Sequence, residues 1–219
     1  MSFDVIKLTV TRGKRYMLSV LRRIWNIVYR INSKTNSEWQ VIKSQSDSIG
    51  WHLKRIVVPI TIGIALSTFI GYLFAFGFYK YSFVYVCLKT IAAFCESFFT
   101  FYVSFLIIFE LSPKIGLISG RESLFKLLAY SFTTFWIASF IAGLCANYKN
   151  LEEFLKFLGL FGVYLFWTGS EILLKISERK KYLFILSSVS IVVVVYLLIH
   201  WAFGYILTIS HFPELFTNM

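Results

Sequence analysis

Long hydrophobic stretches, separated by short polar connections, fill the chain after about residue 55. They lie at residues 56–77, 83–111, 123–147, 154–174 and 182–207. A helix needs about 20 mostly apolar residues to cross a bilayer core of roughly 30 Å. The stretches do not alternate between apolar and polar residues as the strands of a membrane β-barrel do. Because backbone groups in lipid must pair within their own segment, the pattern predicts an all-α, polytopic membrane protein with a bundle of five transmembrane helices.

A segment before the first stretch, residues 16–31, is amphipathic at helical spacing. Apolar residues share one of its faces: Met17, Val20, Leu21, Ile24, Trp25, Val28 and Ile31. Basic residues gather on the opposite face: Arg15, Arg22, Arg23 and Arg30. We therefore predict an N-terminal amphipathic helix. It either lies in the membrane interface, where its arginines bind anionic lipid head groups, or docks on the spans or on a partner protein.

Basic residues are divided unevenly between the two sides of the predicted bundle. Of the 22 Lys and Arg residues, eleven precede the first span, and seven lie in or beside the connections after the second and fourth spans. Only four remain for the other side. By the positive-inside rule, the N-terminus is cytoplasmic and the C-terminus is outside. The prediction is a basic cytoplasmic arm at 1–55, a spanning domain at 56–207 and a short external tail at 208–219.

Composition agrees with a membrane protein and excludes most other classes. Hydrophobic residues make up 58% of the chain and charged residues 15%, against roughly 45–50% and 25% in soluble domains. Disordered, collagen-like and disulfide-rich proteins are excluded on the same grounds. The net charge of +11 lies mostly beside the spans on the predicted cytoplasmic side. We therefore assign it to anionic lipid head groups and topology rather than to nucleic acid.

Motifs for catalysis or metal binding are absent from the sequence. It contains no HExxH, HxxEH, GxSxG or Walker A pattern, and no two of its three cysteines form a CxxC pair. The first 30 residues also lack a continuous apolar signal-peptide core, so we expect the first span to act as an uncleaved signal. We predict a non-enzymatic protein without a cofactor or a metal site.

Ionisable residues inside the predicted spans are candidates for function, because a charge in the bilayer core costs a few kcal/mol. Lys89 and Glu96 are two helical turns apart and share a face, about 10 Å apart along the axis. Glu171 precedes Lys175 by four residues and is predicted to pair with it near the inner surface. A carboxylate of this kind either has a functional role or is held neutral or hydrogen-bonded by other spans. Tyr130 and Ser131 are possible hydroxyl donors to Glu96 or Glu171.

Several short segments resemble the Yip domain, the family of Ypt/Rab-GTPase-interacting membrane proteins and their bacterial relatives. They are SEWQVI at 37–42, IVVPI at 56–60, LFKLLAYSF at 124–132, YLFWTG at 164–169 and KKY at 180–182. Glu38, Trp39 and Pro59 are the residues that carry the resemblance at the start of the domain. It implies a five-span membrane domain. Eukaryotic relatives act in vesicle trafficking, bind small GTPases and shape membranes.

Two functions remain open. The first is a bacterial inner-membrane protein of Yip type that organises or assembles membrane components. It would contact anionic lipids and a membrane-protein partner or a second copy of itself, without nucleic acid. The alternative is a small transporter or channel subunit that uses Lys89, Glu96 and Glu171 within the membrane. A water-filled path at Glu96 favours transport, whereas a dry and packed Glu96 favours the first function.

Overall fold

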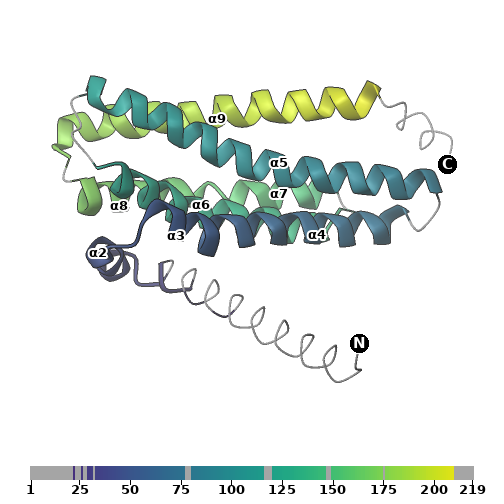
Figure 1. Cartoon of the computed structure of the whole chain (residues 1–219), viewed down its shortest axis with the longest axis horizontal. Coiled ribbons are helices and arrows are strands. Elements are labelled where there is room, and N and C mark those ends of the chain that lie inside the picture. Colours follow the sequence, from purple (N-terminus) through teal and green to yellow (C-terminus); the bar gives the residue numbers. More distant parts are fainter. Residues whose placement is uncertain are drawn as a thin grey trace, which may run out of the picture.

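The computed structural model describes residues 29–31, 33–76, 80–115, 120–146, 149–174 and 176–209, together with Arg22 and Asn26. These residues are helical almost throughout, and none of them lies in a strand. Figure 1 shows the long helices running side by side along one axis. The elements are α2 (Thr35–Ser44), α3 (Ile49–His52), η1 (Leu53–Val57), α4 (Val58–Phe76), α5 (Lys80–Leu111), η2 (Ser112–Ile115), α6 (Arg121–Leu144), α7 (Lys149–Leu158), α8 (Phe161–Leu174) and α9 (Glu178–Ile209).

Within the described residues, four helices are long and apolar enough to cross a membrane. They cover Ile49–Ala75, Phe83–Ile115, Arg121–Leu144 and Lys180–Leu207. These four helices indicate an integral membrane protein, and the described part of the chain is all-helical. The second, third and fifth predicted stretches each correspond to one of these helices within a few residues. The first begins seven residues earlier than the predicted start at residue 56.

The fourth predicted stretch, residues 154–174, is not one continuous helix. It is divided between α7 and α8 by a turn at Gly159 and Leu160, where the Leu160 N–H donates to the Phe157 carbonyl at 3.0 Å. Glycine costs about 1 kcal/mol relative to alanine inside a helix, which weakens the helix at this point. Gly162 also lets α8 approach α6, because a Cβ there would lie 2.6 Å from the Ser131 carbonyl oxygen. The two helices pack in turn along α6, as Figure 1 shows.

The first long helix contains a π-helical turn, η1, directly before Pro59. In this turn the Val58 N–H donates to the Leu53 carbonyl, five residues back. Proline has no N–H, and its ring clashes with the carbonyl four residues earlier in an α-helix. A widened turn relieves this clash. Pro59 lies in the first turn of α4, and α3 and η1 extend the apolar helix back from there to Ile49.

Aromatic side chains form the centre of the bundle around α6, the most buried of the long helices. The Phe101 ring lies 5.3 Å from the rings of both Phe125 and Trp136, measured between centroids. Phe105 packs edge-on against Phe125 at 5.0 Å. In contrast, α9 is the most exposed long helix and packs mainly on α5. The bundle is therefore tightly closed around α6 and more open along α9.

The short helix α2 docks on the end of the bundle, mainly against α8. Trp39 and Ile42 on its inner face are buried in the same core cluster as the spans, and so is Ile31. The predicted amphipathic helix at 16–31 otherwise falls largely outside the described residues, as do Arg15 and Arg23. Arg22 and Arg30 are described and exposed. At Ile31, therefore, the end of this segment contacts the spans.

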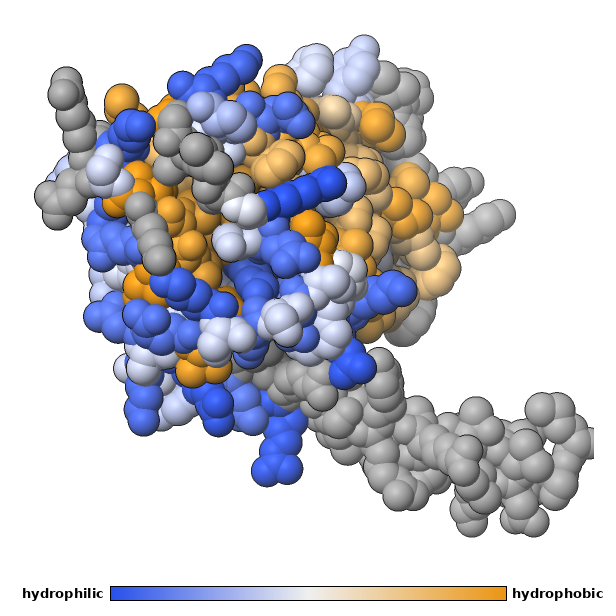
Figure 2. Space-filling model, turned by 60° about the vertical axis from the view of Figure 1, so that its left-hand side comes forward, coloured by the Kyte–Doolittle hydropathy of each residue, from blue (hydrophilic) through white to orange (hydrophobic). Residues whose placement is uncertain are grey.

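The end of the bundle that carries α2 is strongly polar. Figure 2 shows hydrophilic residues covering much of this end, with hydrophobic residues on the flanks behind it. Its exposed basic residues come from α2, η1, η2 and the first turns of α6 and α9: Lys43, Lys54, Arg55, Lys114, Arg121 and Lys180. Apolar flanks with a charged end are the surface expected of a bundle that stands in a bilayer.

Candidate intramembrane polar site

Polar side chains gather around a small cavity of about 100 Å³ between α4, α5, α6 and α9. Both ionisable residues predicted for the second span, Lys89 and Glu96, line it. They lie on one face of α5 because seven residues make almost two helical turns. Hydroxyl-bearing residues from all four helices also line the cavity: Thr68 and Tyr72 from α4, Ser97 from α5, Ser139 from α6 and Tyr196 from α9.

Helix α9 contributes a histidine that pairs with Glu96. The Nδ1 atom of His200 lies 3.4 Å from Oε1 of Glu96, which makes an ion pair when the imidazole is protonated. The side chain of Glu96 is 22% exposed and that of His200 is 54% exposed. The His200 ring stacks on Tyr196 at 5.6 Å between centroids. Sequence reasoning missed both Tyr196 and His200, because they lie about 100 positions after Glu96 and only the tertiary fold brings them together.

Aromatic rings lie around the ammonium group of Lys89. Its Nζ is 5.9 Å from the ring centroids of Tyr72 and Tyr85, within the range of cation–π attraction. The cavity therefore holds a cation, a carboxylate and an imidazole in a small space. Such a set is able to bind a polar group or to pass a proton between Glu96 and His200. It has room for only a few water molecules.

Tyr130 and Ser131 do not join this cavity. The Tyr130 ring instead packs against Trp39 at 6.2 Å and His52 at 5.9 Å, at the α2-bearing end. Ser131 is buried, and its hydroxyl has no hydrogen-bond partner among the described residues. Among the described residues, therefore, no hydrogen bond joins Tyr130 or Ser131 to Glu96 or Glu171, although the sequence suggested one.

Glu171 is also separate from Glu96. It lies in the last turn of α8, half-exposed, and pairs with the ammonium group of Lys181 on α9. Lys181 is buried, and its Nζ lies 4.2 Å from the Trp167 ring centroid. The predicted partner, Lys175, lies outside the described residues. The intramembrane candidates thus form two separate ionic groups rather than one shared site.

Trp39, one of the residues that carry the family resemblance, anchors the α2-bearing end. The Trp39 side chain is fully buried, and Glu38 beside it is partly buried. Trp39 fills the space above Gly169 of α8, where a Cβ would lie 2.6 Å from its ring. Nearby, the Lys126 ammonium group donates to the Gln45 carbonyl that follows α2. These contacts fix α2 to α6 and α8.

Within the described residues, no group of three or more His, Cys, Asp or Glu side chains is placed to hold a metal ion. Glu96 and His200 alone supply two such ligands, which is fewer than the three or four protein ligands of typical zinc sites.

No family model, curated protein or solved structure matches this chain. The resemblance to the Yip domain therefore remains a prediction from the sequence.

Proposed function

We propose that this chain is a non-enzymatic, Yip-type protein of a bacterial inner membrane that organises or assembles membrane components through its basic end. In this proposal the bundle crosses the membrane five times, with α7 and α8 together forming one interrupted span. The α2-bearing end faces the cytoplasm and contacts anionic lipid head groups and a protein partner or a second copy of the chain.

The observation that carries this proposal is the docked α2 at a basic end. The buried Trp39 packs α2 against α8, while the outward side of the same end presents exposed lysines and arginines. Each basic residue near an anionic membrane surface contributes about 1 kcal/mol of attraction. A basic surface beside the bilayer favours binding to acidic lipids or proteins over catalysis.

Native mass spectrometry of the full-length protein tests the lipid part of the proposal. The protein is reconstituted in phosphatidylethanolamine with or without phosphatidylglycerol, and the lipids that remain bound are counted. We expect Lys54→Gln and Arg55→Gln, at two exposed basic positions of this end, to reduce retained phosphatidylglycerol. The matched control, Lys149→Gln, removes the same charge at the opposite end of the bundle. Equal losses in all three variants would contradict a lipid-binding role for this end.

A second candidate function is transport, and the pairing of Glu96 with His200 beside Lys89 is the observation that favours it. A carboxylate–imidazole pair inside a bundle is a common element of proton paths. The cavity is small, however, and Glu171 belongs to a different ionic group. Proton flux into proteoliposomes, followed with an interior pH dye, separates the two functions. Transport requires flux that Glu96→Gln abolishes, whereas the proposed organising role predicts no flux above empty vesicles.

A further inference from the structure

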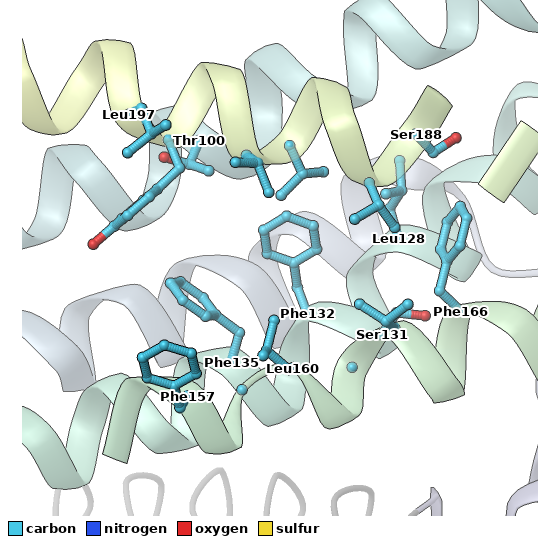
Figure 3. Close-up of a pocket in the computed structure, with 17 residues that line it drawn as sticks. Thr100, Leu128, Ser131, Phe132, Phe135, Phe157, Leu160, Phe166, Ser188 and Leu197 are labelled. Carbon is cyan, nitrogen blue, oxygen red and sulfur yellow. The ribbon is translucent and has the colours of Figure 1, made fainter. Parts of the chain in front are cut away.

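A large apolar cavity lies beside the polar site. It has a volume of about 580 Å³, inside the roughly 300–1,000 Å³ range of small-molecule sites. Its walls come from α5, α6, α7, α8, the turn between α7 and α8, and α9, and most of the lining side chains are phenylalanine, leucine and valine. Figure 3 shows Phe132, Phe135 and Leu160 on one side of the cavity and Leu197 on the other. The cavity forms where α9 packs on α5 and only sparsely on α8.

Three hydroxyl groups on this apolar wall are buried and lack partners. Thr100, Ser131 and Ser188 are each less than 5% exposed, and among the described residues none of their oxygens has a hydrogen-bond partner. Burial of an unsatisfied hydroxyl is unfavourable, so a bound molecule with a polar group within reach of one of them would gain a hydrogen bond there.

The apolar cavity and the polar cavity share one wall. Phe135 and Tyr196 line both, and their rings meet edge to face at 6.0 Å between centroids. On one side of this pair lie aliphatic and phenyl groups, and on the other lie Lys89, Glu96 and His200. A molecule that spans the wall would need a hydrocarbon chain at one end and a polar group at the other.

The charges and size of the polar cavity restrict the head of such a molecule. Lys89 and Glu96 carry opposite charges, so the cavity has no strong preference for an ionic head. The polar cavity is also small, about 100 Å³, which favours a small head group. The polar cavity lies toward the end of the bundle away from α2, and the apolar cavity extends from it toward the middle of the bundle. This is the direction in which a lipid of that leaflet extends.

We propose that these two adjacent cavities bind one neutral, single-chain lipid, with its chain between α6, α8 and α9 and a small hydroxyl or carbonyl head that passes the Phe135–Tyr196 wall to reach Lys89, Glu96 and His200. The chain is either an isoprenoid or a straight hydrocarbon. This site is independent of the basic end and of the function proposed for it.

Binding is tested on the purified full-length protein in detergent, with geranylgeraniol, octadecanol and dioleoyl phosphatidylethanolamine as probes. Native mass spectrometry gives the stoichiometry and affinity, and thermal unfolding gives the stabilisation. We expect one molecule of a single-chain alcohol to bind and to raise Tm. Tighter binding of geranylgeraniol would identify the hydrocarbon part of the lipid as an isoprenoid, and tighter binding of octadecanol would identify it as a straight chain. Equal binding of the phospholipid, or no saturable binding by either alcohol, would overturn the proposal.

Two valines on the same helix provide a matched pair of variants. Val192 lines the apolar cavity, whereas Val194 does not line it and is 53% exposed. We expect Val192→Phe to abolish binding by filling the cavity, and Val194→Phe to bind as the wild type does. Glu96→Gln leaves the apolar cavity intact and tests the head: it should weaken alcohol binding about tenfold. Indistinguishable binding by the two valine variants, or wild-type affinity in Glu96→Gln, would contradict the proposed site.

Discussion

Single residues set how closely the helices approach one another, and the clearest case is Gly71 on α4. A Cβ at this position would overlap the carbonyl of Gly143 on α6, and a Cβ at Gly143 would lie 2.6 Å from the Ser67 hydroxyl. The backbones of α4 and α6 touch here because both positions lack a side chain.

We expect Gly71→Ala to separate α4 from α6 and to lower stability by about 1–3 kcal/mol, the usual cost of overpacking a core. Gly63→Ala on the same helix is the control, since a Cβ there meets Phe140 at an ordinary 3.8 Å. Thermal unfolding in detergent compares the two variants. Equal Tm values for Gly71→Ala and Gly63→Ala would contradict the close approach.

The ion pair between the buried Lys181 and the half-exposed Glu171 gives a second prediction at this scale. Removing the carboxylate leaves a buried ammonium group without its counter-charge, whereas replacing the lysine with an apolar chain of similar length removes the need for one. We therefore expect Glu171→Leu to lower Tm more than Lys181→Met does. The reverse order, measured by the same unfolding experiment, would show that Lys181 does not depend on Glu171.

At the scale of elements, hydrophobic length alone predicted the second, third and fifth spans closely. Hydrophobic length failed to predict the helix boundaries where glycine or proline alters the backbone. The fourth stretch is interrupted at Gly159. The first helix contains a π-helical turn before Pro59 and begins at Ile49 rather than at residue 56. The shared face of Lys89 and Glu96 followed from spacing, but their neighbours on α9 did not. Residues that touch in the fold but lie about 100 positions apart in the chain leave no recognisable pattern in a single sequence.

The docking of α2 is a prediction about an element. Trp39→Ala removes the buried ring that joins α2 to α8, and such truncations cost about 3–5 kcal/mol in a core. We expect the variant to lose stability and α2 to become sensitive to protease. Val41→Ala, on the exposed face of the same helix, should leave both properties unchanged. Protease resistance of α2 in Trp39→Ala would mean that other contacts hold it.

On the scale of the whole molecule, the arrangement is an apolar bundle with a polar cap at one end. The end of α9 lies at the other extreme of the long axis from α2, as Figure 1 shows. If α7 and α8 together cross the membrane once, the number of crossings is odd, and the two ends of the described chain face different compartments. From the uneven distribution of basic residues, we predict that α2 then faces the cytoplasm.

Site-directed thiol labelling tests this topology most directly. Cys87, Cys95 and Cys145 are replaced by serine, and single cysteines are introduced as Ser44→Cys at the end of α2 or Asn218→Cys near the C-terminus. Right-side-out vesicles of a bacterial cytoplasmic membrane are then treated with a membrane-impermeant maleimide. Our account predicts labelling of Asn218→Cys alone, and of both variants after permeabilisation. Labelling of both, or of neither, in sealed vesicles would contradict it.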